Sequence, residues 1–249
     1  MISKIARRLY EDFLMPSRLS EYAELIKMAL AKNYTVLPID QYLQSIKEDH
    51  VKWEKLLILR HDVDSDVETA KHMFDIECEF GIQASYYFRL QTVDTDLMRR
   101  IVNAGGEVGY HFEEIATFIK KKGLRNREEV TKCLPEIRDL FRRNLLSLRS
   151  RTGLPIRIVA AHGDWINRRL RIFNFELLND ELRYELAIEA ETYDPWLASG
   201  ITWRISDGVF PNFWNPIDPK VAFTQDSPAI YILTHPRHWV SNARENLKM

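Results

Sequence analysis

Short apolar runs alternate with amphipathic helical patterns along most of the chain, and this alternation limits the folds it can adopt. Leu56–Leu59 is an apolar run typical of a buried strand. A capping-box pattern from Ser65 to Glu68 follows it, and the helical apolar stripe after that ends at Gly81. The same strand–helix unit recurs, and strands that alternate with helices form mostly parallel sheets. We therefore expect an α/β fold.

Six further segments have the composition of strands, and they are residues 84–88, 108–111, 156–161, 186–190, 201–205 and 229–233. Helices are predicted for residues 20–32 and 127–148, and Pro135 predicts a kink or break in the second of them. No internal repeat or Gly/Ser linker divides the sequence, and 249 residues suit one domain. We expect a single domain over residues 1–249.

Composition excludes some classes of partner and favours one compartment. The 35 basic and 36 acidic side chains nearly cancel, which argues against nucleic-acid binding. Cys78 and Cys133 each fall in a predicted helix and form no metal-binding spacing. We expect both to be buried thiols of a reducing compartment, so the predicted location is the cytoplasm.

The first 15 residues carry apolar side chains at helical spacing but lack the continuous apolar run of a signal peptide. A helix that docks on the domain is the expected structure. Attachment to a membrane surface is the alternative, so any membrane contact is expected to be peripheral.

Most of the histidines follow one positional rule. Five of the seven lie at or just past the carboxyl end of a predicted strand, and so do three aspartates. In parallel α/β folds these strand ends converge on one face, where active sites form. The side chains are His61, His111, His162, His235, His238, Asp62, Asp64 and Asp207. We expect them to contribute to one site.

These residue types suit a metal centre. Asp62 and Asp64 are one residue apart, so they can point to the same side of the chain. Two carboxylates this close repel each other unless a cation or a shared proton lies between them. His111 and His162 could complete a nitrogen and oxygen ligand set that suits Zn²⁺. Capping of the following loop and helix is the alternative role for the two aspartates.

His235 lies in a Leu-Thr-His-Pro turn. Pro236 fixes its own φ and restricts the preceding residue, His235, to an extended backbone. A rigid imidazole at a strand end suits a proton donor, because its ordinary pKa lies near neutral pH. A histidine satisfied by backbone carbonyls is the alternative. Asp207 could orient this imidazole, although Asp207-Gly208 is equally typical of a turn.

Taken in order, these motifs resemble those of a known family. They are Arg60–Asp64 (RHDVD), Gly109–Glu114 (GYHFEE), Ala161–Gly163 (AHG), Ser206-Asp207 and Leu233–Pro236 (LTHP). The sequence is similar from about residue 55 to 240 to the polysaccharide deacetylase superfamily (NodB homology, carbohydrate esterase family 4), especially to a divergent branch whose first motif is HDVD.

The resemblance implies a deformed (β/α) barrel, often seven-stranded, over residues 56–240. Residues 1–55 would then form an N-terminal helical extension packed on the barrel. The implied activity is metal-dependent removal of an acetyl group from an N-acetylated sugar. By position, Asp62 would be the general base, Asp64 and His111 metal ligands, and His235 the general acid, with Asp207 tuning it.

The sequence departs from the family at the second motif, which normally holds a second histidine four residues after the first. Ile115 occupies that position and cannot bind metal. His162 is the first candidate for the third ligand, followed by Glu114 and Glu113.

The arginine that contacts the general base in the family also lacks an obvious counterpart in the third motif. Arg60 or Arg89 could take its place.

Four tryptophans lie near the predicted site face, where they suit stacking on sugar rings, although for each of them taken alone core packing is the favoured role. They are Trp165, Trp203, Trp214 and Trp239. We expect His238, Trp165 and Trp239 to bind substrate.

The expected function is therefore that of a metal-dependent carbohydrate deacetylase, with Zn²⁺ as the expected cofactor. Two alternatives follow from the same residues. A catalytically impaired glycan-binding protein is favoured by Ile115, and an amide hydrolase acting on a non-sugar substrate would use the same scaffold.

Overall fold

The computed structural model describes residues 4–48 and 53–246. Contacts along the chain divide it into two compact units. The first unit comprises Met1–Tyr86, Arg100–Glu107 and Ala198–Met249, and the second comprises Tyr87–Arg99 and Val108–Leu197. The single-domain organisation stays a prediction.

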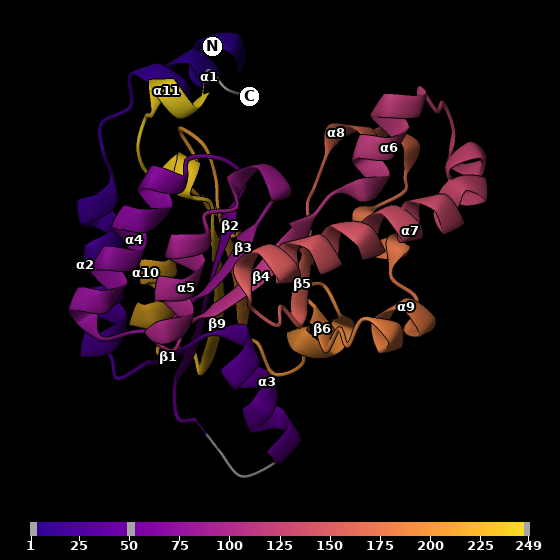
Figure 1. Ribbon diagram of the computed structural model, residues 1–249. Coiled ribbons are helices and arrows are strands. Elements are labelled where there is room, and N and C mark those ends of the chain that lie inside the picture. Colours follow the sequence, from indigo (N-terminus) through magenta and orange to yellow (C-terminus); the bar gives the residue numbers. More distant parts are fainter. Residues whose placement is uncertain (1–3, 49–52, 247–249) are drawn as a thin grey trace. The chain divides into compact units, whose positions relative to one another are not determined.

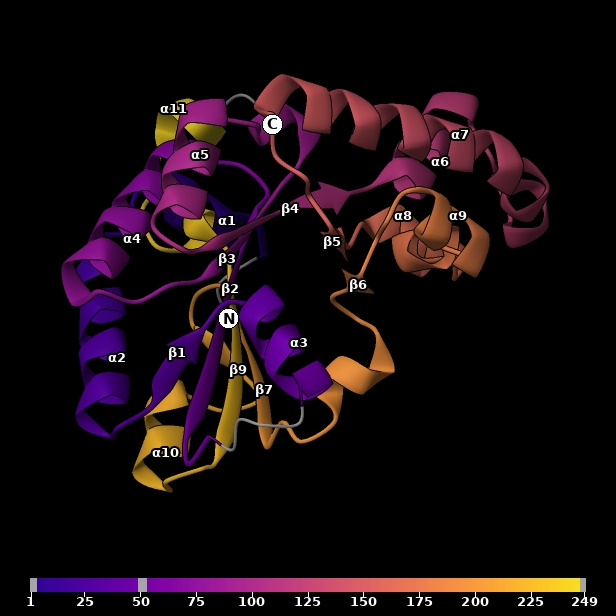
Figure 2. The ribbon, with the colours of Figure 1, turned by 60° about the horizontal axis from the view of Figure 1, so that its bottom comes forward.

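The first unit contains a parallel sheet centred on β2 (Leu56–Val63). Strand β1 (Thr35–Leu37) pairs with one edge of β2, β9 (Ala229–Thr234) pairs with the other, and β7 (Trp203–Asp207) pairs with β9 (Figure 2). The two-residue strand β8 (Trp214–Asn215) runs antiparallel to β7. Every residue of β2 is buried, as expected for a central parallel strand with elements on both faces.

Six helices of the described chain belong to the first unit. They are α1 (Lys4–Phe13), α2 (Leu19–Ala31), α3 (Ile39–Glu48), α4 (Val67–Phe80), α10 (Pro219–Thr224) and α11 (Ala243–Asn246). Helix α2 packs against α4 and α10 (Figure 1). Helix α4 begins one residue later than the predicted capping box implies, because Asp66 is the cap and its side chain accepts the Thr69 N–H.

The N-terminal helix α1 docks on the first unit, as expected for a helix with an apolar stripe. Arg237 donates to Asp12 over 3.1 Å, and the Ser241 hydroxyl donates to the Glu11 carbonyl. The rings of Tyr10 and Phe210 pack with their centroids 5.1 Å apart. None of the helices in the described residues has the length and apolar character needed to cross a bilayer.

The chain passes between the units through β3 (Ser85–Phe88), α5 (Thr95–Asn103) and β4 (Glu107–Phe112). In the second unit β4 pairs in parallel with β5 (Ile158–Ala161), which pairs in parallel with β6 (Ala190–Glu191). The helices there are α6 (Glu114–Lys122), α7 (Arg127–Thr152), α8 (Trp165–Leu170) and α9 (Asp180–Glu185), and α7 lies against α6 (Figure 1). Short 3₁₀ turns occur at Leu90–Thr92, Asn174–Leu177, Pro195–Ala198 and Pro236–His238.

Parallel strands alternating with helices confirm the predicted fold class, an α/β fold of the deformed (β/α)-barrel kind. The residues described hold nine strands, more than the seven that the resemblance implies. The additional ones include β1, from the N-terminal extension, and β8, the short return strand of a hairpin.

One predicted strand is absent, and so is the break that was one of the two outcomes predicted at Pro135. Residues 186–190 do not form a strand, because Ala187 has φ of 48° and breaks the extended backbone, so that β6 begins only at Ala190. Helix α7 continues through Pro135 without a break. Pro135 has no N–H to donate to the carbonyl of Thr131, four residues before it. Thr131 is exposed, so water can donate to that carbonyl instead.

The two cysteines lie in helices as predicted, but they are not buried. Cys78 is exposed and Cys133 is half-buried, and both are free. The cytoplasmic location stays a prediction that these thiols do not support.

Candidate active site

Asp62 is held inside the first unit by an arginine of its own strand. Arg60 and Asp62 are two positions apart in β2, so their side chains leave the same face. Arg60 donates from Nε to Oδ1 over 2.7 Å and from Nη2 to Oδ2 over 2.6 Å. The two side chains are 0% and 2% exposed, and Arg60 also donates to the Tyr231 hydroxyl. This bidentate pair stabilises the ionised form of Asp62.

Arg60, one of the two arginines that the sequence offered, thus contacts Asp62. Arg89 belongs to the second unit, where it pairs with Glu113.

A second buried cluster surrounds Asp207 at the end of β7. His235, the residue after β9, donates its backbone N–H to Oδ2 of Asp207 over 2.7 Å. Its ring Nδ1 lies 2.6 Å from Oδ1 of the same carboxylate, and Nδ1 of His238 lies 3.2 Å from Oδ2. Asp207 therefore fixes the orientation of the His235 imidazole, as the sequence predicts.

The charges of this cluster favour a protonated His235. Burial alone lowers the pKa of His235, but the charge of Asp207 and its hydrogen bond outweigh burial, with smaller contributions from Asp64 and Asp62, and raise that pKa to about 9. Burial likewise opposes ionisation of Asp207, yet the charges of His238 and His235 bring the pKa of Asp207 well below its usual range. The pair is an imidazolium and a carboxylate at neutral pH.

The first unit therefore brings together several of the predicted site residues. Asp64 follows the last residue of β2 and is half-buried. Its charge and that of Asp62 both act on His235. The predicted base, the predicted acid, the residue that tunes the acid and one predicted metal ligand thus lie near the carboxyl ends of β2, β7 and β9.

His61 does not point into an open site. It is fully buried, with Nδ1 2.6 Å from Thr234 Oγ1 and Nε2 2.7 Å from Oε1 of Glu77. The hydroxyls of Tyr22 and Tyr86 both donate to the Glu77 carboxylate. Sequence reasoning missed this network; Glu77 on the apolar stripe of α4 signals a buried carboxylate but not its partners.

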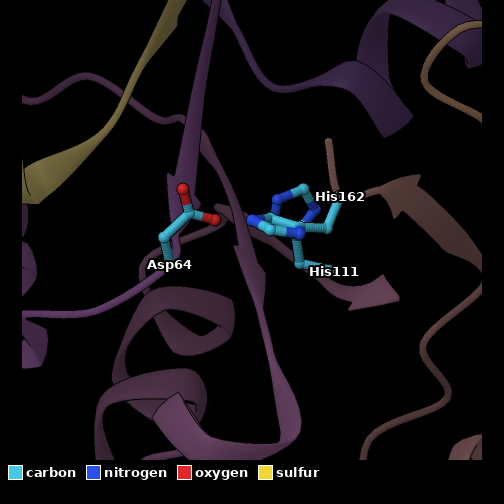
Figure 3. Close-up of side chains that lie close together, drawn as sticks. All are labelled: Asp64, His111 and His162. Atoms are coloured by element: carbon cyan, nitrogen blue, oxygen red, sulfur yellow. The ribbon is translucent and has the colours of Figure 1, made fainter. Parts of the chain in front are cut away.

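His111 and His162 lie side by side in the second unit, with ring centroids 5.1 Å apart and planes at 85° (Figure 3). His111 belongs to β4 and His162 follows β5, which pairs with β4. Nδ1 of His111 donates to the Ala160 carbonyl over 2.9 Å, so in the neutral ring Nε2 carries the lone pair. A histidine with one ring nitrogen bound to a carbonyl and the other basic is the usual metal-binding tautomer, so His111 fits a metal ligand.

The two residues considered next as the third ligand point to other partners. Glu114 is buried, and its Oε1 accepts from Tyr110 over 2.6 Å and from Asn144 over 2.9 Å. Burial raises its pKa although these hydrogen bonds oppose the shift, which favours a neutral carboxyl. Ile115 is fully buried in the first turn of α6.

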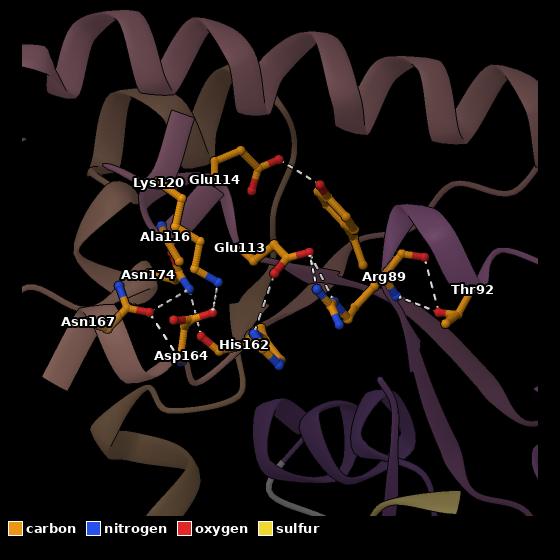
Figure 4. Close-up of polar contacts among 11 residues, drawn as sticks. Arg89, Thr92, Glu113, Glu114, Ala116, Lys120, His162, Asp164, Asn167 and Asn174 are labelled. Atoms are coloured by element: carbon orange, nitrogen blue, oxygen red, sulfur yellow. Dashed lines mark hydrogen bonds and ion pairs between the residues drawn. The ribbon is translucent and has the colours of Figure 1, made fainter. Parts of the chain in front are cut away.

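Glu113 is bound by Arg89, whose Nε donates to Oε1 over 3.0 Å (Figure 4). Its other oxygen lies 3.6 Å from Nδ1 of His162. Asp164 pairs with Lys120 on the same side of this unit. Among the candidates of the second unit, His162 is therefore the one whose ring lies next to His111.

The three predicted substrate-binding residues differ in their surroundings. His238 belongs to the Asp207 cluster. Trp239 is 1% exposed, and its ring packs edge-on against Tyr22 and Trp214. Trp165 is 55% exposed at the start of α8 in the second unit.

No family model matches the sequence, and no curated protein matches it significantly. Solved structures with a similar fold include the pseudoenzyme BA3943 of carbohydrate esterase family 4 from Bacillus anthracis, 16% identical with a TM-score of 0.44 over 78% of this chain and 59% of that one. They also include the peptidoglycan deacetylase PdaC from Bacillus subtilis, 15% identical with a TM-score of 0.43 over 76% of this chain and 80% of that one. A third is a family 4 acetyl xylan esterase from Clostridium thermocellum with a cobalt ion, 16% identical with a TM-score of 0.38 over 73% of this chain and 74% of that one.

The chain spans about three fifths of the length of the first of these structures. The pseudoenzyme and the acetyl xylan esterase belong to carbohydrate esterase family 4, the family whose motifs this sequence resembles.

Proposed function

We propose that this protein is a metal-dependent hydrolase that removes acetyl groups from N-acetylated sugars of a polysaccharide or its precursor. The observation that carries the proposal is the Asp207–His235 pair, which keeps a half-buried imidazole protonated, together with the Asp62 carboxylate that Arg60 holds in place. Amide hydrolysis needs such a combination of a proton donor and a proton acceptor.

His235 supplies the proton donor. An amine leaves an amide only when its nitrogen is protonated, and a pKa of about 9 keeps the His235 ring charged at neutral pH. Nδ1 is occupied by Asp207, so Nε2–H is the group that would donate to the departing nitrogen.

Asp62 supplies the proton acceptor. Each of its oxygens accepts one N–H from Arg60, which keeps the carboxylate in place. A carboxylate in this position is the group proposed to accept a proton from water.

Asp64, His111 and His162 stay the proposed metal ligands on the motifs of the sequence. Their mixed nitrogen and oxygen donors and the tautomer of His111 suit Zn²⁺. When bound, such an ion supplies a Lewis acid that makes water more acidic and polarises a carbonyl group.

A glycan-binding protein without catalysis is the second candidate. The apolar, fully buried Ile115 at the family's usual histidine position favours it.

Acetate release from a β-1,4-linked N-acetylglucosamine tetramer, measured with added Zn²⁺, tests the proposal. We expect release by the wild-type protein and a loss of about 10²–10⁴-fold in Asp62→Asn, with metal content unchanged. Asp75→Asn, an exposed residue of α4, is the matched control and should keep the wild-type rate.

Wild-type acetate release by Asp62→Asn would contradict the assignment of the base. Binding of the tetramer without acetate release by the wild-type protein would favour the second candidate.

A further inference from the structure

A pocket of about 340 Å³ opens between two helices of the second unit, α6 and α8, which pack against each other (Figure 1). It is lined by the end of α6, by the loop that follows it and by α8, and we call it the α6–α8 pocket. None of the side chains assigned to catalysis or to metal binding lines it. Its volume falls at the lower end of the range of small-molecule sites, roughly 300–1,000 Å³.

One side of the α6–α8 pocket is the ring of Trp165. Asp164 caps α8 by accepting the Ile166 N–H over 2.9 Å, which makes Trp165 the first residue of the helix. Trp165 is 55% exposed, and among the residues that the structure describes no other ring and no cation packs on it. The apolar side chains of Leu124 and Leu170 share the lining. The pocket therefore offers an uncovered aromatic ring to a planar ligand.

The charged side chains of the lining are all cationic, and they are Lys120, Arg125 and Arg169. Lys120 is neutralised by its ion pair with Asp164 (Figure 4). The guanidinium groups of Arg125 and Arg169 have no hydrogen-bond or ion-pair partner in the described part of the chain. A guanidinium binds phosphate oxygens through two parallel N–H donors. Two such groups without a counter-ion favour an anionic ligand that carries phosphate.

The loop after α6 brings Arg125 to the pocket, and its backbone is fixed on both sides. Gly123 ends α6 with a left-handed φ of 67°, and its N–H donates to the Ile119 carbonyl over 2.8 Å. The backbone N–H of Arg125 donates to Oε2 of Glu129 over 2.8 Å, and the Asn126 amide donates to Oε1 of the same carboxylate. Both oxygens of Glu129 are thus engaged by the loop, so this nearby acid does not neutralise the Arg125 guanidinium.

These features call for a ligand with two parts, a planar ring that stacks on Trp165 and a phosphate group for Arg125 and Arg169. Inorganic phosphate alone would leave the ring and the apolar lining unused. A neutral sugar would leave both guanidinium groups without an anion. A mononucleotide carries both parts, because every base has a π-face that can stack on an aromatic side chain.

We infer that the α6–α8 pocket binds a mononucleotide, with the base on Trp165 and the phosphate between Arg125 and Arg169. The inference assigns a binding site and no chemical step, so it does not depend on the proposed function. It gives Trp165, which the sequence assigned to the substrate, a role in a different binding site.

Calorimetric binding of adenosine 5′-monophosphate to the full chain tests the inference, with adenosine and inorganic phosphate as probes of the two parts. The nucleotide should bind about tenfold more tightly than either part, or better. Trp165→Ala should weaken nucleotide binding about tenfold, whereas Trp165→Phe, which keeps a ring, should retain most of it. Arg125→Gln and Arg169→Gln should each weaken nucleotide binding about tenfold and leave adenosine binding unchanged, because each removes charged donors to the phosphate.

Two variants of the second unit are matched controls and should leave the affinity unchanged. They are Arg151→Gln, an exposed arginine of α7, and Trp196→Ala, a half-exposed tryptophan. Failure of the wild-type protein to bind the nucleotide at millimolar concentration would overturn the inference, and so would an affinity that the arginine variants leave unchanged. The arginine variants decide the question if Trp165→Ala does not fold. Phosphate or adenosine binding as tightly as the nucleotide would also reject the two-part site.

Discussion

Arg60 and Asp62, two positions apart in β2, form a bidentate ion pair in the interior of the first unit, with N–O distances of 2.7 and 2.6 Å. The strand thus supplies both the proposed base and its counter-ion. In the family that the motifs resemble, that arginine belongs to a later motif. Arg60 can contact Asp62 in place of that arginine, because side chains at positions i and i+2 of a strand point to the same face.

Arg60→Met should destabilise the protein strongly. It removes the counter-charge that Arg60 provides to the buried Asp62 carboxylate, so the free energy of unfolding should fall by about 3–5 kcal/mol. Urea denaturation measures this change. Arg100→Met is the matched control, because Arg100 pairs with Asp75 at the surface and should cost less than about 1 kcal/mol. Equal losses of unfolding free energy in the two variants would show that the buried ion pair contributes no more to stability than the surface pair.

Asp207→Asn should lower the pKa of His235. The amide keeps the size of the side chain but not its charge, which is the main influence that raises this pKa to about 9. NMR titration of the His235 ring should show a midpoint that moves toward the ordinary value of about 6.5. Acetate release should fall most between those two values, where only the wild-type ring stays protonated. A midpoint that stays near 9 would show that Asp207 does not set the charge of His235.

The same pair should make stability depend on pH in a defined window. A histidine whose folded-state pKa is raised stabilises the protein fully below its unfolded value of about 6.5, and this contribution is lost as pH rises through about 9. The free energy of unfolding of the wild-type protein should therefore exceed that of Asp207→Asn most at pH 6, and the difference should shrink by pH 10. Chemical denaturation of both proteins across this range measures it, and a difference that grew with pH would have the wrong sign.

Much of this site could be predicted from the sequence because its signals are local. Asp62, Asp207 and His235 each follow or end a run with the composition of a strand, and parallel strand ends gather on one side. The prediction of a strand over residues 186–190 is wrong because the feature that prevents the strand has no signal in the sequence. A single left-handed residue, Ala187, interrupts the extended backbone there, and its side chain gives no warning of that conformation.

Partners that come from distant segments could not be predicted. Glu77 falls on the apolar stripe of α4 and so looks like an error in the pattern. In the structure it is 1% exposed and meets His61, Tyr22 and Tyr86, which come from β2, α2 and β3. Hydrophobic periodicity identifies the buried face of a helix, but it does not identify the groups on the other side of the contact.

Glu77→Ala should destabilise the fold by about 2–5 kcal/mol, because it leaves the buried hydroxyls of Tyr22 and Tyr86 without their acceptor. Thermal or urea unfolding measures the loss. Glu79→Ala is the matched control on the same helix, since Glu79 is exposed and its removal should change stability by less than about 0.5 kcal/mol. A loss in Glu77→Ala no larger than in Glu79→Ala would mean that the network contributes nothing to stability.

Metal content tests the proposed role of His111 without any assay of activity. After incubation with Zn²⁺ and removal of excess ion, the wild-type protein should retain about one equivalent by mass spectrometry of the metal, as one tetrahedral site requires. His111→Ala removes the imidazole that the hydrogen bond to Ala160 orients, so it should retain far less. His72→Ala, an exposed histidine of α4, should retain as much as the wild type and shows whether surface imidazoles contribute. Equal zinc in all three proteins would show that His111 is not a zinc ligand. No zinc in the wild type would favour the non-catalytic glycan-binding candidate.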